Sequence, residues 1–110
     1  MNTVHLVGEL VSPVECRRDQ ITKRAWGKAI IAVPRGSKGV IDFVPVTLRD
    51  REAEMAPRYL DDGSLVSVQG HLHSAHRTGD VYAVRRFVWV IADRVTYLRL
   101  PRRDGSEGRA

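Results

Sequence analysis

The chain has 110 residues, which is the size of one domain with one core. Its apolar fraction of 43% argues against wholesale disorder, and its formal charge of +5 favours a polyanionic partner, although charge alone does not separate DNA, RNA and a membrane surface. Cys16 is the only cysteine, so an internal disulfide is excluded. The sequence has no leading signal segment and no apolar run near about 20 residues, so we expect a cytoplasmic protein with no membrane contact.

The first third of the chain predicts two strands with a basic segment between them. Residues 3–11 are rich in β-forming side chains and are followed by a Ser-Pro pair, which ends the strand. Residues 14–23 are polar and basic, and they form either a hairpin loop or an extended basic strand. Residues 25–33 alternate in character, which puts Trp26 and Lys28 on one face and small or branched apolar residues on the other.

Residues 40–48 predict a third strand, because apolar side chains recur there with a period of two. Val44 and Val46 then face the core, and Phe43 faces outward. Pro45 has no N–H group to donate, so it must lie at an edge, at a bulge or where no donor is needed.

A short helix is expected to begin at Asp50, whose carboxylate can cap the free N–H groups of the first turn. Ala53, Ala56 and Leu60 recur at helical spacing and predict its buried side. Pro57 opposes this interpretation, because an interior proline removes a hydrogen bond and clashes with the preceding turn. Either the helix is kinked there, or one turn ends and another begins near Ala56.

The second half of the chain predicts two further strands and a tail. The strands cover residues 65–74 and 81–91, and residues 95–98 continue the last strand after a bend at an Ala-Asp pair. Residues 101–110 have no apolar pattern and are expected to form a mobile C-terminal tail. The chain therefore divides into one domain over residues 1–100 and this tail.

The order of elements is strand, strand, strand, helix, strand, strand. An all-β chain with one short helix at this position predicts an OB-fold, a five-stranded Greek-key β-barrel with its helix between strands three and four. Together with the basic charge, this architecture favours nucleic-acid binding. The sequence contains no phosphate-binding glycine loop and no nucleophile-elbow pattern, so we expect neither an enzyme nor a cofactor.

Several segments of the chain resemble bacterial single-stranded DNA-binding proteins. Each motif is common by itself, but their order and spacing together are specific; they are residues 1–10, 42–46, 53–63 and 66–72, with weaker matches over 26–33 and 82–98. The resemblance implies an OB-fold that assembles into a homodimer or, typically, a homotetramer, with single-stranded DNA wrapped over its surface with little sequence preference. It further implies a role in DNA replication, repair or recombination at the nucleoid, with replication or repair proteins as candidate partners.

In this family, aromatic residues on the DNA-binding surface stack against bases, and the resemblance assigns that role to Phe43. The chain departs from the family at Arg35, Arg49 and Arg77, where further aromatic residues are expected. The C-terminal segment, residues 105–110, is neither long nor acidic, whereas replicative members end in a long Gly-rich linker and an acidic tip. These departures indicate a specialised member, similar in this respect to the related primosomal replication protein.

Binding of a single strand needs cations that follow the phosphates and flat groups that stack on the bases. Arginine serves both purposes, because its planar guanidinium also stacks. The alternative is that these arginines are only solvated surface groups. The candidate nucleic-acid-binding residues are Phe43, Trp26, Tyr82 and His73, together with the cationic Arg17, Arg18, Arg24, Lys28, Arg35, Arg49, Arg77 and Arg85.

Two other features of the sequence resemble binding sites. Trp89 lies in a segment that is apolar on both faces, so we expect it to be buried against a second subunit. His71 and His73 share one side of a strand, with His76 near them in sequence, and this spacing suits zinc. No cysteine or carboxylate follows closely enough to complete a zinc site, so we interpret them as surface histidines beside the nucleic-acid groove and predict no metal.

The sequence is compatible with two further functions. An OB barrel of the replication-restart machinery would act mainly through protein–protein contacts, which the reduced aromatic set and the non-acidic end favour. An RNA-binding barrel is compatible with the same fold and charge. The preference between matched DNA and RNA oligomers separates the RNA-binding alternative from single-stranded DNA binding.

Overall fold

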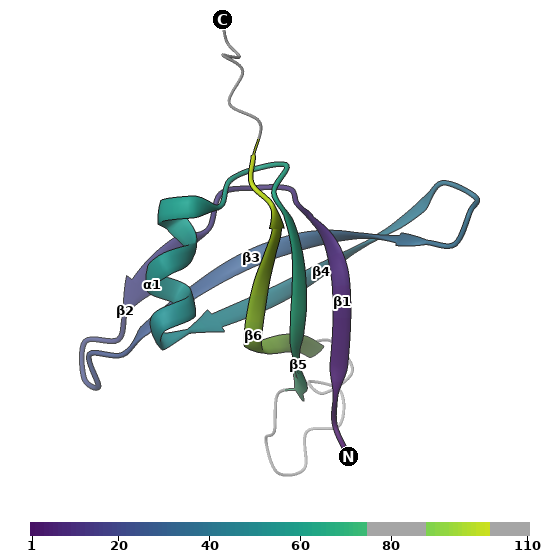
Figure 1. Cartoon of the computed structure of the whole chain (residues 1–110). Helices are drawn as coiled ribbons and strands as arrows, with labels where there is room; N and C mark the ends of the chain where they lie inside the picture. Colours follow the sequence, from purple (N-terminus) through teal and green to yellow (C-terminus); the bar gives the residue numbers. More distant parts are fainter. Residues whose placement is uncertain (75–87, 102–110) are drawn as a thin grey trace, which may run out of the picture.

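The computed structural model describes residues 1–74 and 88–101. Within them the chain forms six strands and one helix, coloured in Figure 1 from purple at the N-terminus towards yellow. The elements are β1 (Val4–Leu10), β2 (Glu15–Arg18), β3 (Ala25–Arg35), β4 (Val40–Arg49), α1 (Asp50–Tyr59), β5 (Leu65–Ser74) and β6 (Val88–Arg99). The strand expected over residues 81–91 is therefore seen only from Val88, and most of the expected tail lies outside the described residues. No helix in the described ranges is long and apolar enough to cross a membrane.

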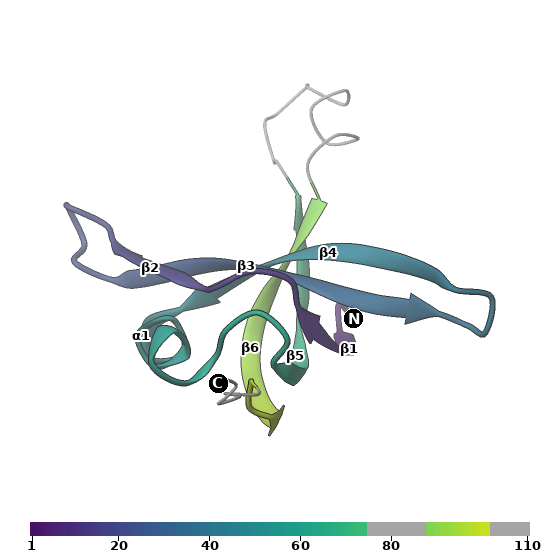
Figure 2. The ribbon, with the colours of Figure 1, turned by 90° about the horizontal axis from the view of Figure 1, so that it is seen from above.

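The strands close into a barrel. Their order in the sheet is β1-β5-β6-β4-β3-β2, and the end of β1 also pairs with β3, through Glu9 opposite Ala32 and Leu10 opposite Ile31. β1, β5, β6, β4 and β3 therefore form a ring of paired strands, seen from two directions in Figures 1 and 2. β1 is the strand predicted over residues 3–11, and it ends before the Ser-Pro pair as expected, whereas β2 lies in the basic segment predicted over residues 14–23. The basic segment contains both the short strand β2 and the turn of a hairpin.

The barrel is filled by side chains that alternate along the strands. Ile31 of β3, Val46 of β4, and Val66 and Val68 of β5 are each 1% exposed. The alternation predicted for β3 and β4 is confirmed, since every second residue of each strand's central part turns towards this core. The remaining residues of these two strands therefore form a face that points away from the core.

Helix α1 packs against β2, β3 and β4 through its small residues Ala53 and Ala56, which are buried as predicted. The predicted cap is wrong, because Asp50 is itself the first helical residue, with a φ of +56°, and the helix has no side-chain cap. The Asp50 carboxylate instead accepts hydrogen bonds from Arg24 at 3.1 and 2.7 Å. A bidentate pair with a guanidinium is stronger than one neutral capping bond. The helix continues through Pro57 to its end, so it does not break near Ala56.

Two glycines let strands cross at very short range. A Cβ atom at Gly70 would lie 2.0 Å from the carbonyl oxygen of Ile91, and one at Gly8 would lie 2.3 Å from that of Ala32. Only glycine fits at such an approach of two backbones. Close to Gly70, β6 contains an extra residue, Asp93, that has no partner on β5. An unpaired residue of this kind bends a strand, so the predicted bend is confirmed as a bulge within a continuous β6.

Two long hairpins extend from the barrel in opposite directions, β2–β3 on one side and β3–β4 on the other (Figures 1 and 2). β3 and β4 pair along almost their whole lengths, whereas β4 meets β6 only at Val46 and Thr47. Pro45 lies just outside this short parallel pairing, so its missing N–H group does not interrupt it. The β3–β4 ribbon therefore provides a long surface that crosses the barrel and continues beyond it.

Candidate nucleic-acid interface

The outward-pointing side chains of β2, β3 and β4 form one surface, which we call the outer face. Residues opposite one another on paired strands point to the same side of a sheet, so the register decides which side chains share it. The rows across the outer face are Arg17, Trp26 and Arg49; Glu15, Lys28 and Thr47; Ile30 and Pro45; and Ala32 and Phe43. The structure thus brings five of the candidate residues, Arg17, Trp26, Lys28, Phe43 and Arg49, onto one surface.

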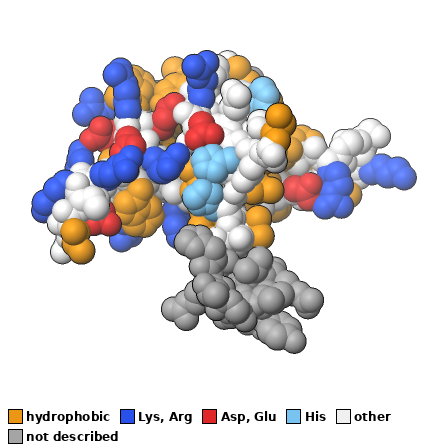
Figure 3. Space-filling view, turned by 90° about the horizontal axis from the view of Figure 1, so that it is seen from below, with side chains coloured by type: hydrophobic (Ala, Val, Ile, Leu, Met, Phe, Trp, Pro, Cys, Tyr) orange, Lys and Arg blue, Asp and Glu red, His pale blue; other side chains and the backbone are white. Residues whose placement is uncertain are grey.

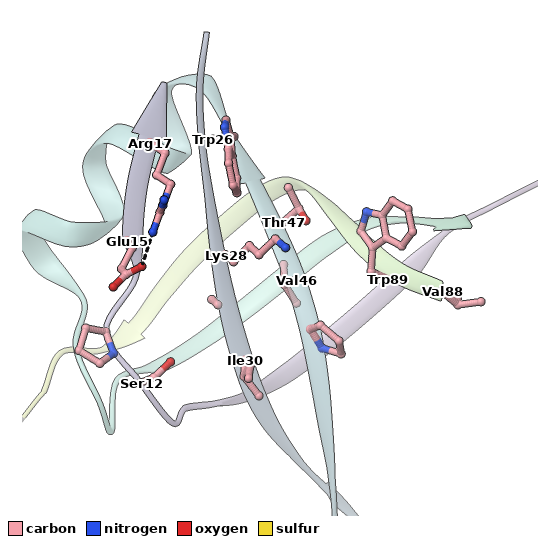
Figure 4. A pocket seen from close by; sticks show the side chains of 13 residues that line it. Ser12, Glu15, Arg17, Trp26, Lys28, Ile30, Val46, Thr47, Val88 and Trp89 are labelled. Atoms are coloured by element: carbon pink, nitrogen blue, oxygen red, sulfur yellow. Dashed lines mark ion pairs between the residues drawn. The ribbon is translucent and has the colours of Figure 1, made fainter. Parts of the chain in front are cut away.

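An open groove of ≈ 970 Å³ lies in the outer face. Figure 4 shows Trp26 of β3 and Trp89 of β6 on its two sides, with Lys28 and Thr47 between them. The Lys28 ammonium lies 5.8 Å from the centre of the Trp26 ring, within the range of a cation–π contact. Both indoles are partly buried, so each still has surface open to a ligand. The groove therefore combines aromatic walls with a cation.

Phe43 lies farther along the ribbon than the groove, and its side chain points outward as predicted. It is 63% exposed, which is unusual for a phenylalanine. Its neighbour on the same face, Ile41, is 48% exposed. A flat apolar ring at this position can stack on a nucleobase without reading its identity, since every base has a π-face.

The candidate arginines on the outer face have acidic partners. Arg17 Nη2 lies 3.6 Å from Glu15 Oε1, and Arg49 Nη2 lies 3.4 Å from Asp93 Oδ1. Figure 3, a view from below, shows basic and acidic side chains interleaved rather than a uniform basic patch. All four of these side chains are exposed, so the pairs are weak and open to exchange. Lys28 makes no ion pair with any residue in the described ranges.

Arg18 and Arg24 lie beside α1 and away from the outer face. Arg18 pairs with Glu54, and Arg24 makes the bidentate pair with Asp50. Hydrogen bonds from the Arg24 guanidinium hold the pKa of the Asp50 carboxyl below its usual range, and the same contact raises the pKa of Arg24. In this structure both arginines stabilise the junction between the β2–β3 hairpin and the helix.

Arg35 lies near the tip of the β3–β4 hairpin, on the side opposite Phe43. It donates two hydrogen bonds to Asp42, at 3.2 and 2.5 Å. These bonds lower the pKa of the Asp42 carboxyl and raise that of Arg35. The alternation of the strand explains the placement, because Arg35 continues the series that turns towards the core.

A chain of polar and aromatic side chains borders the groove on its β5–β6 side. Asp93, the bulge residue, contacts Arg49 through one oxygen and His71 Nδ1 through the other, at 3.0 Å. The Nε2 atoms of His71 and His73 are 3.0 Å apart, so one donates a hydrogen bond to the other. The His73 and Trp89 rings lie 6.2 Å apart between centroids. In the described ranges no three potential metal ligands cluster.

Arg77, Tyr82 and Arg85, and also His76, lie outside the described residues. His73, in contrast, lies within the described residues, next to Trp89, which lines the groove. Its position follows from its register opposite Trp89 on β6.

Trp89, which lines the groove, was not among the candidate binding residues that the sequence predicts. The run Val90, Ile91 and Ala92 is buried without alternation, which hides the outward position of Trp89 in a sequence pattern. The structure places the indole on the groove within a single chain, and burial against a second subunit stays a prediction. The apolar pair Ile30 and Pro45 was likewise missed, although the alternation of β3 and β4 already put both on the outward side.

Comparison with known proteins identifies the family. Residues 1–98 match the model of the single-strand binding protein family. The chain belongs to this family. The predicted resemblance is confirmed, and the family's name denotes binding rather than catalysis. A single-stranded DNA-binding protein of Clostridium tetani is 30% identical to this chain over 116 aligned positions, which cover 98% of this chain and 79% of the relative.

Solved structures of the single-strand binding protein family share the fold. A deletion mutant of the single-stranded DNA binding protein from Thermus aquaticus superposes with a TM-score of 0.70 and 25% identity. That alignment covers 94% of this chain and 42% of the Thermus aquaticus chain, so this chain spans less than half of that protein. The SSB domain of a Synechococcus protein superposes with a TM-score of 0.72 and 15% identity, covering 88% of this chain and 96% of that domain. The predicted OB-fold is confirmed.

Proposed function

We propose that this protein binds single-stranded DNA along the outer face, with little sequence preference. The observation that carries the proposal is the register of β2, β3 and β4, which aligns stacking groups and cations on one surface. Cations neutralise the phosphates and flat groups hold the unpaired bases, which are the two requirements of single-strand binding. A duplex hides its bases from such stacking groups, so the same surface discriminates against it.

Phe43 and Trp26 are the stacking groups in this proposal. Each contributes about 1–3 kcal/mol per base, the range found for aromatic platforms. Lys28, Arg17 and Arg49 hold the phosphates between them. Since both arginines already contact carboxylates, a phosphate has to replace those partners or share the guanidinium with them. Lys28 therefore supplies the first phosphate contact.

The other candidate residues extend the path of the strand. Arg18 and Arg24 flank one end of the outer face, Arg35 flanks the other, and His73 borders the groove. Their contribution is secondary here, because the three arginines point away from the stacking groups and are paired with carboxylates. Arg77, Tyr82 and Arg85 remain candidate contacts on sequence grounds.

The protein acts as a homodimer or homotetramer in this proposal. β1 pairs with β5 on one side, but on the other it meets β3 only at Glu9 and Leu10. Within the described residues the edge over Val4–Gly8 is therefore unpaired, and an unpaired edge favours pairing with a second chain. In this proposal the protein functions in DNA replication, repair or recombination in the cytoplasm at the nucleoid, where replication and repair proteins meet single-stranded DNA.

Fluorescence anisotropy of a labelled oligo-dT, titrated with the intact protein, tests the function. We expect binding that unlabelled oligo-dT displaces and that equimolar duplex or a matched RNA oligomer displaces poorly. Phe43→Ala should weaken the binding, whereas Tyr59→Ala, which removes an exposed aromatic ring on α1, should not. Equal displacement by duplex would contradict the proposal, and preferential displacement by RNA would reassign the surface to RNA binding.

A further inference from the structure

The chain contains two tryptophans, and both line the same groove. Trp26 comes from β3 and Trp89 from β6, two strands far apart in the sequence. Tryptophan is scarce and large, and a partly exposed indole keeps apolar surface in water. Two such side chains on one open groove therefore indicate a surface built to receive a flat apolar group.

The two sides of the groove differ in the residues that lie next to each tryptophan. On the Trp26 side, Lys28 lies 5.8 Å from the indole centre and Arg17 lies opposite Trp26 on β2. On the other side, the His73 ring stands next to Trp89, and its polar edge is held by His71. One side therefore offers positive charge, and the other offers neighbouring rings, tilted by about 60° to one another, with hydrogen-bonding nitrogens.

The floor of the groove contains apolar residues, and the hydroxyls of Ser12 and Thr47 and the carboxylate of Glu15, which lies opposite Lys28 on β2, also line the groove. Ile30, which is 42% exposed, lies opposite Pro45, and Thr47 is the next outward residue along β4. The volume of ≈ 970 Å³ is at the upper end of the range of about 300–1,000 Å³ for small-ligand pockets. The combination of flat walls, an apolar floor and a flanking cation suits a planar heteroaromatic ring that carries an anionic group.

We propose that the groove is a base-binding pocket, in which an unstacked nucleobase of the bound strand lies between Trp26 and Trp89 with its phosphate at Lys28. This inference rests on the proposed function and deepens it, because it adds a second base site to the one at Phe43. Phe43 and Thr47 are four residues apart on β4, or about 13 Å along the strand. The two sites therefore hold two different bases of one strand.

Binding in the pocket should change the fluorescence of the tryptophans, a signal that Phe43 does not provide. Because the only two indoles line the groove, the tryptophan emission of the intact protein, excited where tyrosine does not absorb, reports on the groove alone. We titrate the protein with unlabelled oligo-dT and record this emission, while anisotropy of a labelled strand records total binding in parallel. Trp26→Phe leaves Trp89 as the sole reporter, and Trp89→Phe leaves Trp26. The expected result is a change in emission in the unmodified protein and in both single-tryptophan variants, retained in Phe43→Ala.

Affinity provides the second readout. Trp89→Ala should weaken oligo-dT binding about 5-fold or more, the effect of losing one stacking contact, while Trp89→Phe should retain most of it. If Trp89→Ala fails to fold, Ile30→Glu replaces it, because Ile30 is exposed and a carboxylate there repels the phosphate. The charge-matched control is Leu98→Glu, at an exposed position near the end of β6.

The outcomes separate the two claims. If anisotropy shows binding but the emission of either single-tryptophan variant stays constant, the two-walled pocket is overturned while single-stranded DNA binding stands. Unchanged affinity in Trp89→Ala, or an equal loss in Ile30→Glu and Leu98→Glu, overturns it as well. If no labelled single strand binds at all, it is the proposed function that fails.

Discussion

The acidic partners on the outer face predict that removing them tightens DNA binding and makes it more sensitive to salt. Glu15→Gln frees Arg17, and Asp93→Asn frees Arg49. Both pairs are exposed and long, at 3.6 and 3.4 Å. Exposed pairs contribute about 0.2–1 kcal/mol each, so each substitution should raise affinity about 1.4- to 5-fold at low salt.

The salt dependence of the affinity tests this prediction more sharply than the affinity at one salt concentration. For single strands, log affinity falls with log salt by about 0.7 for each phosphate neutralised. Lys28 has no carboxylate to displace and contributes fully in every variant. Two freed arginines can add up to about 1.4 to the slope, so the double variant should lose up to about 7-fold more affinity than the unmodified protein between 50 and 200 mM salt.

The assay is anisotropy of labelled oligo-dT at four or more salt concentrations. The control is Asp62→Asn, which changes the charge by the same unit at an exposed turn away from the outer face. If Glu15→Gln and Asp93→Asn give the slope and affinity of the Asp62→Asn protein, the carboxylates do not compete with phosphate. That result would refute the assignment of Arg17 and Arg49 to the DNA path.

Three further predictions concern stacking, packing and pH. Phe43→Ala should weaken oligo-dT binding about 5-fold or more with an unchanged melting temperature, and equal affinity would remove Phe43 from the site. Gly70→Ala should lower the melting temperature by several degrees in calorimetry, because its Cβ meets the Ile91 carbonyl at 2.0 Å and overpacking costs about 1–3 kcal/mol; an unchanged value would contradict the close crossing. The hydrogen bonds from Arg35 hold the pKa of the Asp42 carboxyl below its usual value of about 3.8, so the stabilisation that this contact provides is present above that value and is lost as the pH falls through the lower folded-state pKa. Urea unfolding of Asp42→Asn should therefore depend less on pH below about 4 than the unmodified protein, and parallel curves would count against the pair.

Much of the fold is predictable from local patterns. The period of two along β3 and β4 identifies the core positions Ile31 and Val46 and, by alternation, the outward position of Phe43. The spacing of Ala53 and Ala56 likewise predicts the buried side of α1. These assignments succeed because a strand or helix fixes side-chain direction from local geometry alone.

Features that depend on distant partners are not predictable in this way. Aspartate is a residue type that often caps helices, but the Asp50 carboxylate accepts hydrogen bonds from Arg24 of the β2–β3 hairpin instead. Arg35 pairs with Asp42 because the register of β3 and β4 brings the two side chains together, and composition does not reveal this register. A count of arginines therefore overstates the free positive charge of the surface. Trp89 is hidden for a related reason, since the bulge in β6 disrupts the alternation that would reveal its direction.

The most direct test of the central claim is to map the DNA on the protein by nuclear magnetic resonance. Backbone and indole N–H signals of the isotope-labelled protein are followed as oligo-dT is added. We expect the largest shifts at Lys28 and Phe43 and at both indoles, with small shifts over α1 and its exposed Tyr59. Shifts concentrated on α1, or equal shifts produced by duplex DNA, would contradict a single-strand site on the outer face.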